Sequence, residues 1–225
     1  IKGKVSKQTV SFRLLSNLIV FPIDVNGQEM NFILDSGVGS TILFNLEPRD
    51  SIKLLNIRKM KLQGLGSGGA VNAIVSRGNT ISLKAIRGKG ILLYVIFDDS
   101  FDLSSKLGIT IHGIIGYDIL KDFVVSVNYS SKKISFYSPE KYVYKKCKKC
   151  NSFELDIYKK KPYILAGVKL DSNSERVVPV KLLIDSGGSE ALWLFENSHP
   201  AIVKPSKYFR DYLGEGLSGV IYGKK

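Results

Sequence analysis

Two short segments of the chain repeat one unusual pattern, in which an apolar strand-like run ends at an aspartate. FILDSGVGST begins at Phe32 and LLIDSGGSEA begins at Leu182, so Asp35 and Asp185 lie 150 residues apart. A carboxylate at the end of an apolar strand is costly to bury unless it is paired or hydrogen-bonded. This constraint predicts that the two acids lie together in the folded chain.

A second feature recurs at the same distance after each aspartate. The two glycine-rich turns are GLGSGG, with Gly64, Gly66 and Gly69, and GEGLSG, with Gly214, Gly216 and Gly219. Each turn begins 29 residues after its own aspartate. A single D-S-G is common in ordinary turns, but two matched features at one spacing indicate an internal repeat.

Short strand-like runs separated by tight turns dominate the chain. Leu18–Val25 and Gln28–Leu34 flank Asn26-Gly27, which is typical of a two-residue hairpin turn. Further strands are expected at Ile57–Leu62, Ala70–Val75, Thr80–Ile86, Ile91–Phe97, Phe123–Tyr129 and Lys133–Tyr137. Helical pattern is confined to Phe101–Leu107 and Tyr117–Lys121, so the fold is predicted to be mainly β.

The repeat also predicts how the chain is divided. Residues 139–152 are polar, basic and aperiodic, as a linker is. Beyond them, Pro162–Leu170 and Val177–Ile184 repeat the order of strand, turn, strand and D-S-G. We therefore expect a first lobe at 1–138, a linker at 139–152 and a partial second lobe at 153–225.

The chain carries 33 Lys and Arg against 20 Asp and Glu, a formal net charge of +13. Such a charge can attract nucleic acid, but the basic residues are mostly scattered, with local runs at Tyr144–Lys149 and Lys159–Lys161. No nucleic-acid-reading motif accompanies them. The runs are interpreted as solvated surface, and no nucleic acid partner is expected.

The two cysteines, Cys147 and Cys150, form a lone C-x-x-C. A zinc site would need a second pair of ligands, and His112 and His199 are not at ligand spacing. A linker with incidental thiols is favoured over a metal or redox role. No metal and no cofactor are expected.

The longest apolar run, Ile91–Phe97, is far shorter than the ~20 residues of a membrane helix. Residues 1–25 do not resemble a signal peptide, because Arg13 interrupts any apolar stretch. The chain begins at Ile1, which is compatible with a removed leader. Localisation stays open, with an exported or periplasmic protein slightly favoured over a cytoplasmic one.

A pair of carboxyl groups has definite chemical consequences. Two carboxylates in contact cannot both ionise cheaply, so the pair is expected to hold one proton between them. The ionised member can then accept a proton from water while the other donates to a substrate carbonyl. Gly37 and Gly187 allow close backbone approach, and the hydroxyls of Ser36 and Ser186 can tie the two loops together.

These residues resemble the aspartic peptidases of the retropepsin and pepsin clan, in which D-T-G or D-S-G loops supply the catalytic pair. GIIGYDILKDFVVSVNY, beginning at Gly113, is similar to the clan's apolar-apolar-glycine strand and short helix, which brace the aspartate loop. The resemblance implies catalytic roles for Asp35 and Asp185, support from Gly113, Ile114, Ile115 and Gly116, and flaps at the glycine-rich turns. The flap-like segments and the two-part chain also resemble bacterial two-lobed retropepsin-like proteins, some of which carry an appended PDZ module.

The second copy has no equivalent of the Gly113–Gly116 brace, whose place would fall near positions 263–266, so the second lobe is expected to be incomplete in this chain. Two functions stay open: an aspartic endopeptidase acting on a peptide or protein, and a non-catalytic descendant that binds peptides in the same cleft. A C-terminal PDZ module is an expectation for the parent protein only.

Overall fold

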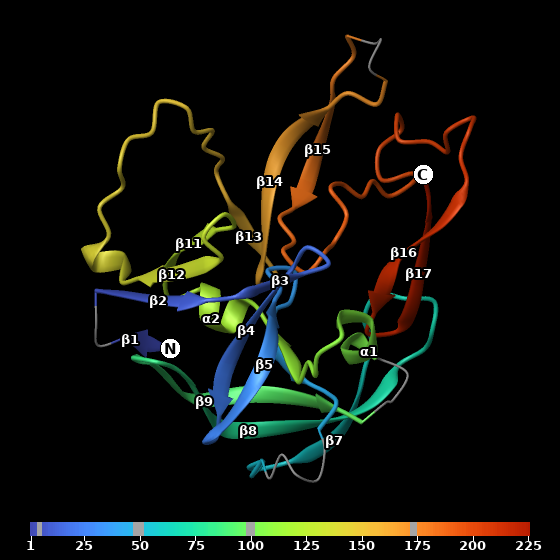
Figure 1. Ribbon diagram of the computed structural model, residues 1–225. Coiled ribbons are helices and arrows are strands. Elements are labelled where there is room, and N and C mark those ends of the chain that lie inside the picture. Colours follow the sequence, from blue (N-terminus) through green and yellow to red (C-terminus); the bar gives the residue numbers. More distant parts are fainter. Residues whose placement is uncertain (4–5, 47–51, 98–101, 172–174) are drawn as a thin grey trace.

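Strands dominate the computed structural model, which describes residues 1–3, 6–46, 52–97, 102–171 and 175–225 (Figure 1). The two α-helices in these ranges are short, α1 at Leu103–Leu107 and α2 at Tyr117–Leu120. The prediction of a mainly β protein is therefore confirmed. Within the described ranges, no helix has the length and apolar character needed to cross a bilayer.

The largest sheet has nine strands and contains most of the core. Its order is β1-β9-β6-β10-β5-β4-β8-β7, and β3 pairs with β4. The strands are β1 Lys2–Gly3, β3 Arg13–Leu15, β4 Leu18–Val25, β5 Gln28–Leu34, β6 Thr41–Leu43, β7 Arg58–Leu62, β8 Val71–Leu83, β9 Ile86–Ile96 and β10 Gly113–Ile115. Phe21, Phe32 and Leu43 are among its fully buried side chains.

The β4–β5 hairpin delivers the first aspartate. Its turn has positive φ at Asn26 and Gly27 (53° and 91°), the conformation that an Asn-Gly hairpin turn requires. β4 and β5 pair antiparallel from Val20 opposite Ile33 to Val25 opposite Gln28. The last three residues of β5, Phe32, Ile33 and Leu34, are apolar and buried, so Asp35 begins the loop where this apolar end of the strand stops.

β10 and α2 support this loop from the other edge of β5. β10 runs parallel to β5, with Gly113 opposite Phe32, and Asp35 N donates to Ile115 O at 2.9 Å. A Cβ added at Gly113 would lie 2.4 Å from Ile42 O, and one at Gly116 would lie 1.9 Å from Asp35 O. Both glycines are therefore required by close backbone approach rather than by turn conformation.

Three smaller sheets complete the chain. One has the order β11-β12-β2, another β13-β14-β15, and the last is the β16–β17 hairpin. Their bounds are β2 Lys7–Ser11, β11 Val124–Asn128, β12 Lys133–Tyr137, β13 Asp156–Tyr158, β14 Lys161–Val168, β15 Val178–Leu183, β16 Arg210–Gly216 and β17 Gly219–Lys224. Figure 1 shows β14 and β15 rising away from the large sheet.

The segment 153–225 buries little apolar surface of its own. Among its described residues, Val178 and Ile202 are the buried hydrophobic side chains, whereas Leu165 on β14 is 79% exposed. β15 pairs with β14, and in the described part of the chain nothing pairs with its other edge, whereas β5 pairs there with β10. The core that positions the first aspartate therefore has no equivalent around the second. The predicted division at 139–152 stays a prediction.

The structure differs from the sequence prediction at several strands. The prediction of separate strands at Ala70–Val75 and Thr80–Ile86 is wrong, because β8 runs from Val71 to Leu83 as one strand and Ile86 begins β9. A register shift beside Gly78 (φ +85°) absorbs the extra residues, so that pairing with β9 continues. Helix α1 begins at Leu103 behind an Asp102 N-cap, and Phe101 of the expected helix lies outside the described residues.

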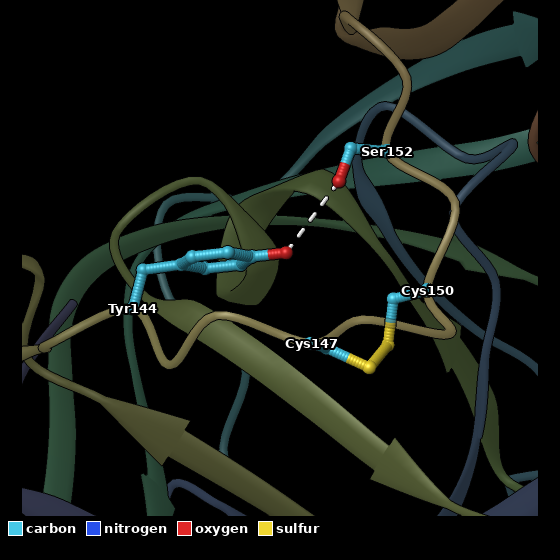
Figure 2. Close-up of a disulfide and its surroundings, with 4 residues drawn as sticks. All are labelled: Tyr144, Cys147, Cys150 and Ser152. Atoms are coloured by element: carbon cyan, nitrogen blue, oxygen red, sulfur yellow. Dashed lines mark hydrogen bonds between the residues drawn. A yellow bond between two sulfur atoms is a disulfide. The ribbon is translucent and has the colours of Figure 1, made fainter.

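The prediction of incidental thiols at Cys147 and Cys150 was wrong, because the two residues form a disulfide (Figure 2). The bond closes a small loop within the exposed segment 139–152. Tyr144 OH and Ser152 Oγ approach to 3.5 Å beside it, so the contact is local to this segment. The sequence missed it because a C-x-x-C pair alone does not distinguish thiols from a disulfide.

The close approach at Gly116 predicts a large effect of a single methyl group. Gly116→Ala would drive a Cβ into the Asp35 carbonyl, and backbone cannot move aside as a side chain can. We expect the free energy of unfolding to fall by about 3 kcal/mol or more. Gly69→Ala is the control, since a Cβ there meets nothing within 4 Å. Urea unfolding measures both, and equal effects would contradict the prediction.

Candidate active site

The two D-S-G loops face each other and bring two carboxyl groups together. Asp35 follows β5 and Asp185 follows β15. Gly37 N donates to Asp35 Oδ1 at 2.7 Å, and Gly187 N donates to Asp185 Oδ1 at 2.8 Å. The two side chains are close enough for Asp185 to raise the pKa of Asp35 by its charge and by hydrogen bonding. Each acid is thus held by its own loop and contacts the other.

Each loop also places a glycine against the opposite acid. A Cβ added at Gly37 would lie 2.8 Å from an oxygen of Asp185, and one at Gly187 would lie 2.4 Å from an oxygen of Asp35. Any larger residue at either position would collide with the opposite carboxylate. The glycines therefore allow the loops to approach until the acids meet.

Four hydrogen bonds from two serines lock the loops together. Ser186 N donates to Ser36 Oγ at 3.0 Å, and Ser36 N donates to Ser186 Oγ at 3.1 Å. Each hydroxyl donates in turn to the carbonyl of the residue before the opposite aspartate, Ser36 Oγ to Ile184 O at 2.5 Å and Ser186 Oγ to Leu34 O at 2.8 Å. Both hydroxyls are donor and acceptor at once, so the arrangement is fully satisfied.

The environment of Asp35 favours its protonated form. Burial, the neighbouring charge of Asp185 and hydrogen bonding between the two side chains together raise the pKa of Asp35 to about 7. The backbone N–H of Gly37 and the charge of Lys161 oppose this rise in pKa. The pair can therefore retain a proton near neutral pH.

Contacts outside the two loops are also reciprocal. Asn17 Nδ2, from the turn between β3 and β4, donates to Ser189 O at 3.3 Å. From the turn between β13 and β14, Lys160 packs against Gly39, where an added Cβ would lie 3.4 Å from the Lys160 Cβ. Each turn thus contacts the segment just after the D-S-G motif of the opposite repeat.

The two glycine-rich segments meet each other. Residues 63–70 join β7 to β8, and we call them the first glycine loop. Ser218, in the turn of the β16–β17 hairpin, is buried against it. Ser218 N donates to Leu65 O at 2.9 Å, and Ser218 O accepts from Gly68 N at 2.6 Å. Ser218 Oγ also accepts from Gly64 N at 3.0 Å.

The glycines of these segments are not equivalent. A Cβ at Gly66 or Gly64 would collide with Ser218 or Leu217, and one at Gly216 would lie 2.2 Å from Leu65 O. At Gly69 and Gly214 an added Cβ would meet nothing within 4 Å, and at Gly219 it would meet only Gly68 N, at 3.8 Å. Close packing explains the first three glycines, while Gly214 and Gly219 have positive φ (150° and 100°).

A partly buried ion pair fixes the β16–β17 hairpin to α1, and Figure 1 shows the two elements next to each other. Lys106 Nζ pairs with Glu215, whose side chain is only 10% exposed, and donates to Tyr212 OH at 2.7 Å. Leu217, at the turn of the hairpin, and Leu107 of α1 both pack against the buried apolar cluster that includes Ile111. Sequence reasoning missed these contacts because Lys106 and Glu215 are far apart in the chain.

The remaining site residues support rather than face the acids. Ile114 and Ile115 pair with β5, and Asp118 of α2 accepts from Thr41 N and Oγ1, both at 2.9 Å. Asp118 was also missed by the sequence analysis. Among the described residues, no group of three or more His, Cys, Asp or Glu side chains is arranged to hold a metal ion.

A family model described as aspartyl protease matches residues 21–119. The matched segment includes Asp35, the first glycine loop and the Gly113–Gly116 brace, and it ends before Asp185. This match confirms the resemblance predicted from the motifs and supports a protease-like function. No curated protein sequence matches the chain.

Two solved structures are similar to parts of the chain. A retropepsin-like aspartic protease from Rickettsia conorii has a TM-score of 0.44 and 13% identity, over 61% of this chain and 96% of that one. The protease of EIAV, a retrovirus, solved with the inhibitor HBY-793, has a TM-score of 0.32 and 24% identity, over 46% of this chain and 85% of that one.

The raised pKa of Asp35 predicts how stability depends on pH. Folded Asp35 keeps its proton to about pH 7, whereas the ordinary value is 3.8. Between these values the folded protein binds more protons than the unfolded chain, so the Asp35 contribution to stability falls as pH rises. The slope is at most about 1.4 kcal/mol per pH unit, the value for a difference of one bound proton.

Urea unfolding at pH values from about 4 to 7 measures this effect. Asp35→Asn should remove most of the slope, so the variant gains stability relative to the parent as pH rises. Glu154→Gln, at an exposed carboxylate, is the control and should leave the slope unchanged. Parallel curves for the parent and Asp35→Asn would contradict the prediction.

Proposed function

We propose that this protein is an aspartic endopeptidase that hydrolyses peptide bonds with water activated by Asp35 and Asp185. The observation that carries the proposal is the mutual contact of the two D-S-G loops, in which each acid is bonded by its own glycine N–H and lies against the glycine of the other loop. The aspartyl protease match to residues 21–119 supports the same class.

The chemistry follows from one proton shared by the pair. Asp35 retains a proton to about pH 7 because it is buried and lies beside Asp185. In the singly protonated pair, the ionised carboxylate accepts a proton from the attacking water while the protonated one donates to the scissile carbonyl. The serine hydrogen bonds hold the two groups in register, so no large rearrangement is needed during the reaction.

The first glycine loop and the β16–β17 hairpin are proposed to act as the flaps. Their mutual hydrogen bonds through Ser218 describe a closed arrangement. A peptide would have to displace or reorder these contacts to reach the acids. Closure after binding would exclude water from the reaction, as mobile loops do in many enzymes.

One observation favours the alternative of a non-catalytic peptide-binding protein. The segment that carries Asp185 lies outside the family match and buries only Val178 and Ile202 among its described hydrophobic residues. If a buried core supports only the Asp35 loop, the protein can bind a peptide although the two acids are not fixed in the geometry that catalysis needs. Inhibition of cleavage by a statine-type transition-state mimic distinguishes the two functions, since a binding protein has no cleavage to inhibit.

Substitution of either acid is the direct test of the proposal. Asp35→Asn and Asp185→Asn should each abolish hydrolysis of peptide substrates, with at least about a thousand-fold loss of kcat, because the near-isosteric amide cannot act as a base. Circular dichroism and urea unfolding should show an intact fold. Glu154→Gln should retain full activity, and residual activity near the parent level in either Asn variant would rule out the pair.

The ion pair at α1 predicts a measurable change in the proposed flap. Lys106→Met should release the β16–β17 hairpin, because it removes both the partner of Glu215 and the donor to Tyr212. We expect backbone amides of residues 210–224 to exchange up to about five-fold faster. This factor corresponds to a fall of about 1 kcal/mol in the free energy of local opening of the hairpin. Hydrogen–deuterium exchange measures this without any need for activity.

Lys169→Met is the matched control for this measurement. It removes a lysine from an ion pair with Glu175, whose side chain is 97% exposed, so exchange in residues 210–224 should not change. Equal exchange in the parent and Lys106→Met would show that the ion pair does not hold the hairpin. If the hairpin is a flap, the variant also changes KM for peptides.

A further inference from the structure

Two turns of the same shape flank the carboxyl pair. Ser16-Asn17 has φ values of 46° and 65°, and Lys159-Lys160 has φ values of 48° and 65°. The first turn pairs Leu15 with Leu18, and the second pairs Tyr158 with Lys161. Because each turn contacts the loop that follows the opposite aspartate, the two turns occupy equivalent places at the two ends of the site.

The residues at these equivalent places differ in charge. The first turn presents the amide of Asn17 and is followed by Leu18, which is buried in an apolar cluster. The second presents Lys159 and Lys160, both exposed, and is followed by the partly exposed Lys161. A neutral pair of residues at one end thus corresponds to cations at the other.

A fourth lysine joins this end from the first repeat. Lys121, after α2, and Lys160 both lie over the ring of Tyr117, with Nζ at 5.9 and 6.0 Å from its centre. We call Lys121, Lys159, Lys160 and Lys161 the lysine cluster. Within the part of the chain that the structure describes, none of these four ammonium groups forms a salt bridge.

The nearby acidic groups do not neutralise the lysine cluster. Asp118 is engaged by Thr41, and Asp122 pairs with the amino group of Ile1. The charge of Lys161 acts on Asp35, where it lowers the pKa against the effect of burial. Among the described residues the lysine cluster therefore has no carboxylate partner, and it lies within electrostatic reach of the reacting centre.

The charged groups at the opposite end of the site are paired with one another. Glu190 follows Ser189, the residue that Asn17 contacts, and both Glu190 and Asp211 pair with Lys225 at 3.0 Å. One cation there serves two carboxylates. An extended peptide lying across the acids would meet the lysine cluster on one side and a lysine already paired with two carboxylates on the other.

We propose that the lysine cluster selects peptides that carry aspartate or glutamate on one side of the scissile bond. This inference rests on the proposed peptidase function and names its substrate class. Electrostatic interactions at a partly exposed site act over about 10 Å, and an extended residue spans about 3.3 Å. The preferred acidic side chain therefore lies within about three residues of the scissile bond.

Matched peptide pairs test the inference. Each pair differs by Glu against Gln at one position, scanned over three residues on either side of the scissile bond. We expect kcat/KM to favour Glu by about three- to ten-fold at one or more positions on one side, the range for two exposed ion pairs. On the other side Glu should give no advantage. Raising the salt from about 0.05 to 0.5 M should shrink the preference.

Variants assign the preference to these lysines. Lys160→Gln combined with Lys161→Gln should bring the Glu-to-Gln ratio close to one, and the double change to Glu should reverse it in favour of Lys-containing peptides. A merely structural role of the lysines would not reverse the preference. Lys145→Gln combined with Lys146→Gln, in the exposed segment 139–152, is the control of equal charge change and should keep the preference.

Binding to the Asp35→Asn protein separates this inference from the proposed function. Fluorescence anisotropy of labelled Glu and Gln peptides should show the same preference without cleavage. Cleavage or binding with equal strength for Glu and Gln at every position would overturn the inference and leave the peptidase intact. Failure of the parent protein to cleave any peptide would overturn the proposed function, and the binding ratio alone would then decide the inference.

Discussion

The four hydrogen bonds between Ser36 and Ser186 and the opposite loops are the constraint on which the site depends. They are the contacts that hold two acidic loops, from sheets with separate strand pairings, at a fixed distance. Each such bond contributes about 0.5–1.5 kcal/mol, which offsets part of the cost of placing Asp35 beside Asp185. The arrangement of the two acids and the contact between the two D-S-G loops are thus one structural feature.

Support for this contact is uneven. On the first side, β5 pairs with β4 and β10, and backbone atoms of the Asp35 loop fill the space beside Gly116. On the second side, β15 pairs with β14 in the described residues, and the apolar side chains of the hairpin are largely exposed. The first loop is therefore held by its own core, whereas the Asp185 loop is held chiefly through the serines and the packing of glycines on the opposite acid.

The sequence predicted what depends on local chemistry and spacing. Asn26-Gly27 predicts the hairpin before Asp35, and the matched D-S-G motifs predict that the two acids meet. β6 at Thr41–Leu43 was missed because three residues carry no periodic signal. β16 and β17 were read only as a glycine-rich turn, since Gly214, Gly216 and Gly219 lower β propensity.

The Lys159–Lys161 run shows the limit of sequence reasoning most clearly. Its composition is that of a solvated surface, and the sequence analysis interpreted it so. The φ values of Lys159 and Lys160 match those of Ser16 and Asn17, which places the run at one end of a repeated site rather than on a remote face. A twofold repeat makes the two ends of a cleft alike in shape, so only residues that break the repeat can give a bound peptide a direction. Lys160 and Lys161 occupy the positions equivalent to Asn17 and Leu18 and differ from them in charge. Complementary charge gives specificity for a partner, so this difference can orient a bound peptide.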